Sequence, residues 1–166
     1  MKKNKSKIYI LIIMLISWLS LLFVGKENIK KYLPASIFMS SLVFAENILA
    51  EKIKWWTIPV KLVPNVNGIL PFVLGSFLTG SIWILKLTYR NFYLYLIVNI
   101  VVDSLFTYPF YTLFRRLGVW RLIRLSQFQL SLLFFYKSLL MYAFQRYIVE
   151  PLRDRDNEKR PVTDIQ

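Results

Sequence analysis

Five long apolar blocks divide this 166-residue chain, and almost all of its charged residues lie outside them. Of 22 Lys and Arg and 9 Asp and Glu, only Glu46, Asp103 and Lys137 lie well inside a block. Hydrophobic residues make up 56% of the chain, whereas a soluble domain has about 45–50% apolar residues. This pattern excludes a disordered chain and predicts an all-α integral membrane protein, with one transmembrane helical domain over residues 1–149.

The blocks predict about five transmembrane helices, over residues 8–24, 33–50, 69–88, 92–114 and 128–149. The first block follows the basic sequence MKKNKSK, and no A-x-A-like pair follows it. An uncleaved anchor is therefore favoured over a cleaved signal peptide. Pro34 fits the first turn of the second helix. Residues 150–166 are polar and predict a disordered tail.

Two connectors carry residues that suit the headgroup layer. Residues 51–68 contain paired tryptophans beside lysines, and prolines that exclude a spanning helix; a tryptophan-lined ligand lid is the alternative. Residues 115–127 alternate arginine with apolar residues, which predicts a basic amphipathic helix lying in the interface against anionic headgroups. The predicted headgroup anchors are Trp55, Trp56, Arg115, Arg116, Trp120, Arg121 and Arg124.

The net charge of +13 fits this membrane interpretation. A nucleic-acid-binding protein gathers its basic residues on one soluble face, whereas here they flank apolar blocks. No nucleic-acid partner is expected. Lys and Arg are nearly balanced between the two sides of a five-helix arrangement. The first helix and the arginine-rich segment at 115–127 favour an N-terminus on the inner side, where the leaflet is anionic.

Catalytic chemistry has little support in the sequence. The absence of Cys and His excludes thiolate and imidazole chemistry and the metal sites that need them. No Walker loop or other phosphate-binding signature occurs. Intramembrane aspartyl proteases carry Tyr-Asp and Gly-x-Gly-Asp, but this chain has Val102-Asp103 and Ala45-Glu46. Ser138 follows Lys137 directly, so on a helix it points about 100° away. The sequence predicts no enzyme, no cofactor and no metal.

The intramembrane polar candidates are Glu46, Asn99, Asp103 and Lys137. Asp103 and Lys137 lie near the middle of consecutive antiparallel helices, and an unpaired charge at that depth costs roughly 2.5–3.5 kcal/mol. We therefore expect Asp103 and Lys137 to pair, with Glu46 as the rival partner of Lys137. An ion pair that sets helix register is favoured over a proton or ion relay, and over contact with a polar substrate or lipid headgroup.

Small residues recur four apart in the third block, at Gly75, Ser76, Thr79 and Gly80. Such residues let a neighbouring backbone approach closely in lipid and predict a helix-packing interface. Two functional hypotheses follow. The first is a non-catalytic membrane protein that packs against a membrane protein partner or forms a homo-oligomer. The alternative is a small transporter or channel subunit in which Glu46, Asp103 and Lys137 handle a proton, an ion or a headgroup.

Residues 31–118 include LPASIFMSSLVFAENILAEKIKWW, LPFVLGSFLTGSIWILKLTY and NIVVDSLFTYPFYTLFRRLG. This half of the chain resembles small multi-pass membrane proteins of spore-forming Gram-positive bacteria to which no activity is assigned. The resemblance implies a bacterial plasma membrane location. It carries no function over to any residue.

Overall fold

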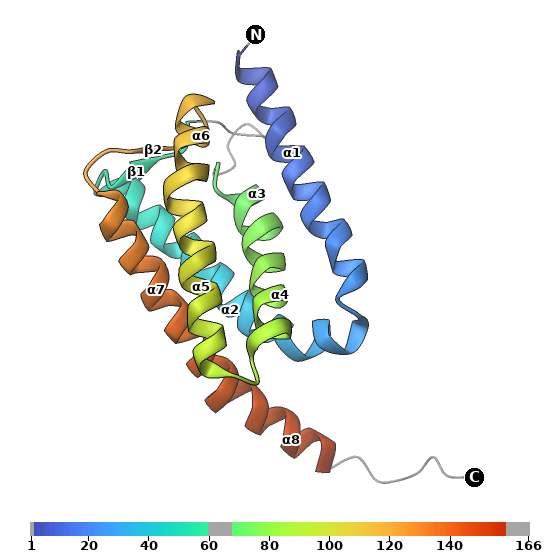
Figure 1. Ribbon diagram of the computed structural model, residues 1–166. Coiled ribbons are helices and arrows are strands. Elements are labelled where there is room, and N and C mark those ends of the chain that lie inside the picture. Colours follow the sequence, from blue (N-terminus) through green and yellow to red (C-terminus); the bar gives the residue numbers. More distant parts are fainter. Residues whose placement is uncertain (1, 60–67, 159–166) are drawn as a thin grey trace.

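The computed structural model describes residues 2–59 and 68–158, and the side chains of residues 7–59 and 68–155. These described residues are 83% helical and form five helices (Figure 1). The first two are α1 (Lys2–Ser20) with the 3-10 turn η1 (Leu21–Phe23), and α2 (Lys26–Lys52). Each of the other three contains a π-helical segment. The third helix consists of α3 (Leu70–Phe72), the π-helical η2 (Val73–Phe77) and α4 (Leu78–Thr88). The fourth consists of α5 (Phe92–Leu105), the π-helical η3 (Phe106–Phe110) and α6 (Tyr111–Arg116). The fifth consists of α7 (Gln127–Phe144), the π-helical η4 (Gln145–Val149) and α8 (Glu150–Glu158).

Three helices of the described chain are long and apolar enough to cross a membrane: Lys26–Lys52, Leu70–Thr88 and Phe92–Arg116. The predicted all-α class is thus confirmed, and its composition indicates a membrane protein. The apolar helical stretch Lys7–Phe23, formed by α1 and η1, covers the first predicted span. A helix also covers the fifth predicted span. Five crossings remain a prediction.

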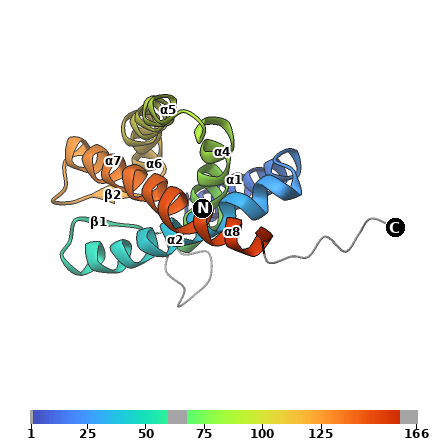
Figure 2. The ribbon, with the colours of Figure 1, turned by 90° about the horizontal axis from the view of Figure 1, so that it is seen from below.

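Four of the helices form the centre of the bundle. The helix α2 packs against α4 and α7, and α5 packs against the same two helices. The remaining helix, α1, lies at the periphery beside α3 and α4 (Figure 2). The strands β1 (Trp56–Thr57) and β2 (Arg121–Leu122) lie at one end, called the strand end below. The α4–α5 turn and α8 lie at the other, the α8 end (Figure 1).

Local signals explain where these helices begin. Gly25 has φ +86°, a conformation that favours glycine, and it allows the chain to turn from η1 into α2. The side chain of Asn91 accepts a hydrogen bond from the Leu94 N–H and caps α5. Ser126 and Gln129 form a reciprocal capping box at the start of α7.

The interfacial helix predicted over residues 115–127 is not present. The helix α6 ends at Arg116, because Gly118 adopts φ +69° and reverses the chain. The strand β2 then pairs antiparallel with β1, with Trp56 opposite Leu122. The Ile123 N–H donates to the Trp55 carbonyl at 2.9 Å. The backbone groups of this segment are therefore satisfied by strand pairing rather than by a helix.

Two predicted boundaries also differ from the structure. The helix α2 begins at Lys26, so Pro34 lies inside it and not in its first turn. The predicted disordered tail is wrong for Glu150–Glu158, which form α8. Glu150 joins this helix to the bundle, because its carboxylate lies 2.8 Å from Arg146 and 3.9 Å from Lys31 of α2. The predictions for residues 60–67 of the connector and 159–166 of the tail lie outside the described residues.

Candidate functional site

A polar layer separates two apolar clusters along the bundle. The cluster at the strand end includes Leu130 and Phe134 of α7, and the cluster at the α8 end includes Met141 of α7 and Tyr95 of α5. Between them, α7 carries Lys137 and Ser138, α5 carries Asn99 and Asp103, and α2 carries Glu46. All four intramembrane polar candidates from the sequence therefore lie in one layer across the middle of the bundle.

An ion pair links α7 to α2 in this layer. The Lys137 Nζ lies 2.5 Å from the Glu46 Oε2, and the two side chains are 7% and 17% exposed. The Lys137 Nζ also lies 4.4 Å from the centroid of the Phe134 ring. An opposite charge and an aromatic face stabilise the ammonium away from water. Glu46, the rival partner in the sequence, is thus the residue that pairs with Lys137.

The predicted pair of Asp103 and Lys137 is not formed. Among the described residues Asp103 makes no salt bridge, and its Oδ2 is buried without a hydrogen-bond partner. Consecutive antiparallel helices match two residues in depth, but depth does not determine which face of each helix points inward. Here α2 also packs against α7, and it brings Glu46 to Lys137.

The larger of two cavities in this layer has a volume of about 190 Å³ and lies between α2, α4, α5 and α7. Its charged lining residues are Asp103 and Lys137. Its neutral polar lining residues are Ser76, Ser81, Asn99 and Ser138. A cavity of this size holds several water molecules or a hydrated ion, because one water needs roughly 10–15 Å³ by this measure.

The smaller cavity has a volume of about 50 Å³ and extends from the ion pair toward the strand end. Glu46 and Lys137 line it together with mainly aromatic and aliphatic side chains, including Trp56 and Trp120. The indole N–H of Trp120 has no hydrogen-bond partner among the described residues. Both cavities are bordered by Lys137 and by a wall of three phenylalanines, Phe77, Phe106 and Phe134.

Hydrogen bonds hold the polar face of α5 toward the centre of the bundle. The hydroxyl of Tyr95, fully buried, donates to the Ser138 carbonyl of α7 at 2.7 Å. The Asn99 Nδ2 donates to the Tyr95 carbonyl at 2.7 Å. Thr107 and Tyr111, which continue the same spacing of four along this helix, are also buried. Asp103 lies on this inward-facing stripe between Asn99 and Thr107.

The charges in the layer do not balance when all three groups are ionised. Glu46 neutralises Lys137, which leaves one negative charge on Asp103 beside the larger cavity. A proton or a small monovalent cation at Asp103 would restore neutrality. No group of three or more acidic side chains that could hold a metal ion occurs in the described parts of the chain. A divalent cation, which takes several oxygen ligands, has less support.

The small residues of the third block are used within the chain. A Cβ at Gly75 would lie 3.2 Å from the Met14 Cγ of α1. The Ser76 Oγ lies 3.4 Å from the Ser17 Oγ of the same helix. Thr79 donates to the Gly75 carbonyl at 2.8 Å, whereas a Cβ at Gly80 would meet nothing within 4 Å. The helix α1 therefore occupies the part of this face formed by Gly75 and Ser76.

The predicted headgroup anchors divide into two groups. Trp56 and Trp120 are 4% and 9% exposed and belong to the apolar cluster at the strand end, so their rings are core residues and not surface anchors. The Trp56 Nε1 donates to the Asn47 Oδ1 at 2.7 Å, and Trp55 packs against the same cluster. By contrast, the four arginines are all exposed at this end: Arg115, Arg116, Arg121 and Arg124.

Sequence reasoning missed Ser81, Ser138 and the three phenylalanines that border the cavities. Their positions inside apolar blocks make them indistinguishable from residues that face lipid. The sequence signal that pointed to this layer was the presence of Glu46, Asn99, Asp103 and Lys137 inside apolar blocks. No family model, no curated protein and no solved structure matches the chain. The geometry of the polar layer is therefore the only guide to function.

Proposed function

We propose that this protein is a small multi-pass protein of the bacterial plasma membrane whose polar layer binds a proton or a monovalent cation at Asp103. The observation that supports it is the setting of Asp103: its Oδ2 is buried with no hydrogen-bond partner among the described residues, and the residue lines a cavity of about 190 Å³. In this proposal all five helices cross the bilayer. The polar layer then lies near its middle.

The energetics favour a functional role for Asp103. A carboxylate near the centre of a bilayer costs roughly 2.5–3.5 kcal/mol on insertion scales. Glu46 reduces this cost by pairing with Lys137, but Asp103 has no such partner. Ionisable residues inside membranes are rare and usually belong to ion or proton pathways. A bound cation or proton would provide the missing charge.

The neutral residues of the larger cavity suit this role. Ser76, Ser81, Asn99 and Ser138 can offer oxygen atoms to a partly dehydrated cation, or hydrogen bonds to a water that carries a proton. The Lys137–Glu46 pair contributes no net charge to the cavity. Five helices are few for a complete secondary transporter, so the chain would act as a homo-oligomer.

The alternative role, packing against another protein without handling an ion, has less support. It depended on Gly75, Ser76, Thr79 and Gly80. Gly75 and Ser76 contact α1 of the same chain, and Gly80 borders the larger cavity. These three residues are therefore used within the described part of the chain.

Flux measurements on the full chain test the proposal. The purified protein is reconstituted into liposomes, and proton, Na⁺ and K⁺ fluxes are measured after a diffusion potential is imposed. We expect flux of one of these ions for the wild type, loss of that flux for Asp103→Asn, and partial recovery for Asp103→Glu. The matched control is Asp154→Asn, which removes an exposed carboxylate on α8. Absence of all three fluxes in the wild type, or full flux in Asp103→Asn, would contradict the proposal.

A further inference from the structure

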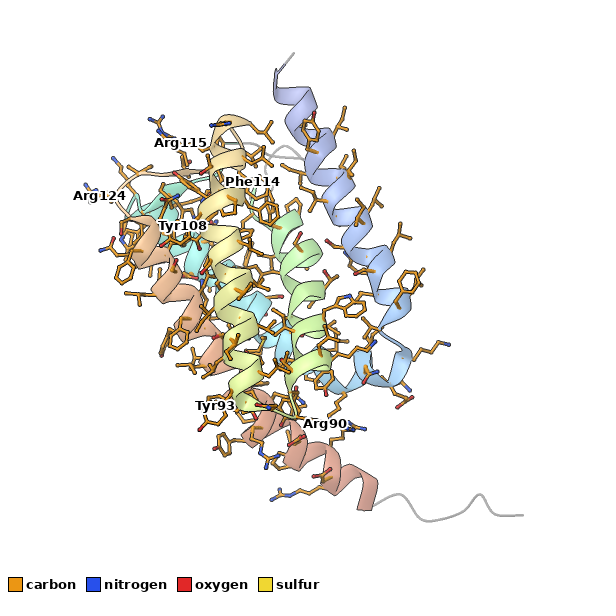
Figure 3. All side chains as sticks on the ribbon, in the orientation of Figure 1. Arg90, Tyr93, Tyr108, Phe114, Arg115 and Arg124 are labelled. Atoms are coloured by element: carbon orange, nitrogen blue, oxygen red, sulfur yellow. The ribbon has the colours of Figure 1, made fainter. Side chains whose placement is uncertain are left out.

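The strand end carries a concentration of positive charge that the bundle itself does not neutralise. Four exposed arginines lie within ten residues of sequence, and no Asp or Glu occurs between Asp103 and Glu150. Among the described residues none of the four forms a salt bridge. Figure 3 shows Arg115 and Arg124 at this end, and Arg90 and Tyr93 at the other. The arginines are therefore available to an anion from outside the chain.

A shallow groove of about 480 Å³ lies beside these arginines, between the helix of η3 and α6 and the first turn of α7. Its lining combines one arginine with polar and apolar side chains: Tyr108, Pro109, Thr112, Leu113, Arg116 and Gln127. The five residues from the first helix lie at helical spacing and form one continuous stripe. Arg116 ends this stripe toward the strand end, and Tyr108 begins it about two turns deeper.

The π-helical segment shapes the groove. Pro109 lies inside η3 and has no N–H to donate to a preceding carbonyl. Gln127 donates from its Nε2 to the Thr107 carbonyl at 3.2 Å, which ties the first turn of α7 to this widened segment. The Thr112 hydroxyl donates to the Tyr108 carbonyl at 2.8 Å. These contacts satisfy the Thr107 and Tyr108 carbonyls, and the Arg116 guanidinium forms no salt bridge among the described residues and can donate to a ligand.

We propose that this groove binds one anionic phospholipid. The phosphate would accept hydrogen bonds from the Arg116 guanidinium, whose planar fork matches phosphate oxygens. An acyl chain would follow the exposed side chains of Leu113 and Tyr108 away from the strand end; these side chains are 48% and 43% exposed. The apolar wall distinguishes a lipid from a free phosphate ion. The proposal rests on the membrane location but not on the role of Asp103.

Native mass spectrometry of the full chain in detergent tests this site. The protein is titrated with phosphatidylglycerol, with phosphatidylcholine and, separately, with glycerol phosphate. We expect one retained phosphatidylglycerol per chain, weaker retention of phosphatidylcholine and none of glycerol phosphate. Arg116→Gln should weaken phosphatidylglycerol binding about tenfold, the usual effect of losing one charge-assisted hydrogen bond. Arg116→Lys, which keeps the charge, should weaken it less.

The matched control is Arg90→Gln, which removes an exposed arginine at the α8 end. It lowers the net charge by the same amount and should leave phosphatidylglycerol binding unchanged. Equal weakening by Arg90→Gln and Arg116→Gln would show that total charge attracts the lipid and would overturn the site. Equal retention of phosphatidylcholine would overturn the requirement for an anionic headgroup. Tight binding of glycerol phosphate would show that the ligand is a free phosphate ester and not a lipid.

Discussion

Lys137 on α7 and Glu46 on α2 form a buried ion pair across 91 residues of sequence. Asp103, on the neighbouring helix α5, makes no salt bridge with any described residue, and its Oδ2 has no hydrogen-bond partner among them. This division leaves the polar layer with one negative charge that is not compensated inside the bundle. It makes the two carboxylates chemically different, because Glu46 has a fixed counterion whereas Asp103 faces a cavity.

The ion pair should dominate the stability of the layer. Removing either partner leaves a buried charge, so Glu46→Gln and Lys137→Met should each lower the free energy of unfolding by about 3–5 kcal/mol. The double variant should lose much less than the sum of the two. Unfolding titrations with a denaturing detergent measure all three. The same cycle for Asp103 with Lys137 should show weaker coupling, and additive losses for Glu46 with Lys137 would contradict the pair.

The Asp103 carboxylate, which we propose binds a proton or a cation, should lower the free energy of unfolding. Asp103→Asn replaces a carboxylate that has no partner with a neutral amide of similar size. We expect the free energy of unfolding to rise by about 1 kcal/mol, a fraction of the roughly 2.5–3.5 kcal/mol insertion cost of a central charge. The measurement is the unfolding midpoint in mild detergent. A lower midpoint for Asp103→Asn would show that the carboxylate has a stabilising partner, and Asp154→Asn should leave the midpoint unchanged.

The hydroxyl of Tyr95, as well as its ring, should contribute to the stability of the protein. Tyr95→Phe removes the hydrogen bond to the Ser138 carbonyl at a fully buried position and should lower the free energy of unfolding by about 1 kcal/mol. The control is Tyr93→Phe on the same helix, because that ring is 77% exposed (Figure 3). Thermal unfolding of the two variants in the same detergent compares them. Equal midpoints would show that the hydroxyl of Tyr95 adds nothing.

Replacing two glycines of the same helix with alanine should change the stability of the protein in opposite directions. At Gly75 a new Cβ would lie 3.2–3.3 Å from Met14 of α1, so α1 must shift, and we expect Gly75→Ala to destabilise by about 1 kcal/mol. At Gly80 a Cβ would meet nothing within 4 Å. Because alanine reduces the entropy of the unfolded chain, Gly80→Ala should raise the free energy of unfolding by about 0.5–1 kcal/mol. Thermal unfolding measures both. An equal increase in stability for Gly75→Ala and Gly80→Ala would exclude the close contact of Gly75 with α1.

Orientation can be measured on a clean background, because the chain has no Cys. With the N-terminus inside, the strand end faces the cytoplasm. An impermeant thiol reagent added to intact cells should then label Arg90→Cys, and it should label Arg124→Cys only after the cells are opened. Both positions are exposed and lie at opposite ends of the bundle (Figure 3). The reverse labelling pattern would place the N-terminus outside.

The failed predictions at the strand end share one physical cause. The arginine-rich segment 115–127 has the composition of an interfacial helix, but Gly118 and the pairing of β2 with β1 give its backbone other hydrogen bonds. Tryptophans beside basic residues are typical of headgroup anchors, but the rings of Trp56 and Trp120 contact each other in the apolar cluster at the strand end. In each case a contact with a segment far away in sequence overrode a local preference.

Local patterns alone determined the all-α class, the positions of the apolar helices and the identity of the charged residues inside them, because hydropathy and helical spacing act over one or two turns. Only the tertiary structure decided that Lys137 pairs with Glu46 and not Asp103, and that α1 covers Gly75 and Ser76. Spacing along a chain specifies which face of a helix is polar. The neighbour of that face depends on how all the helices pack at once, because each buried contact restricts the others.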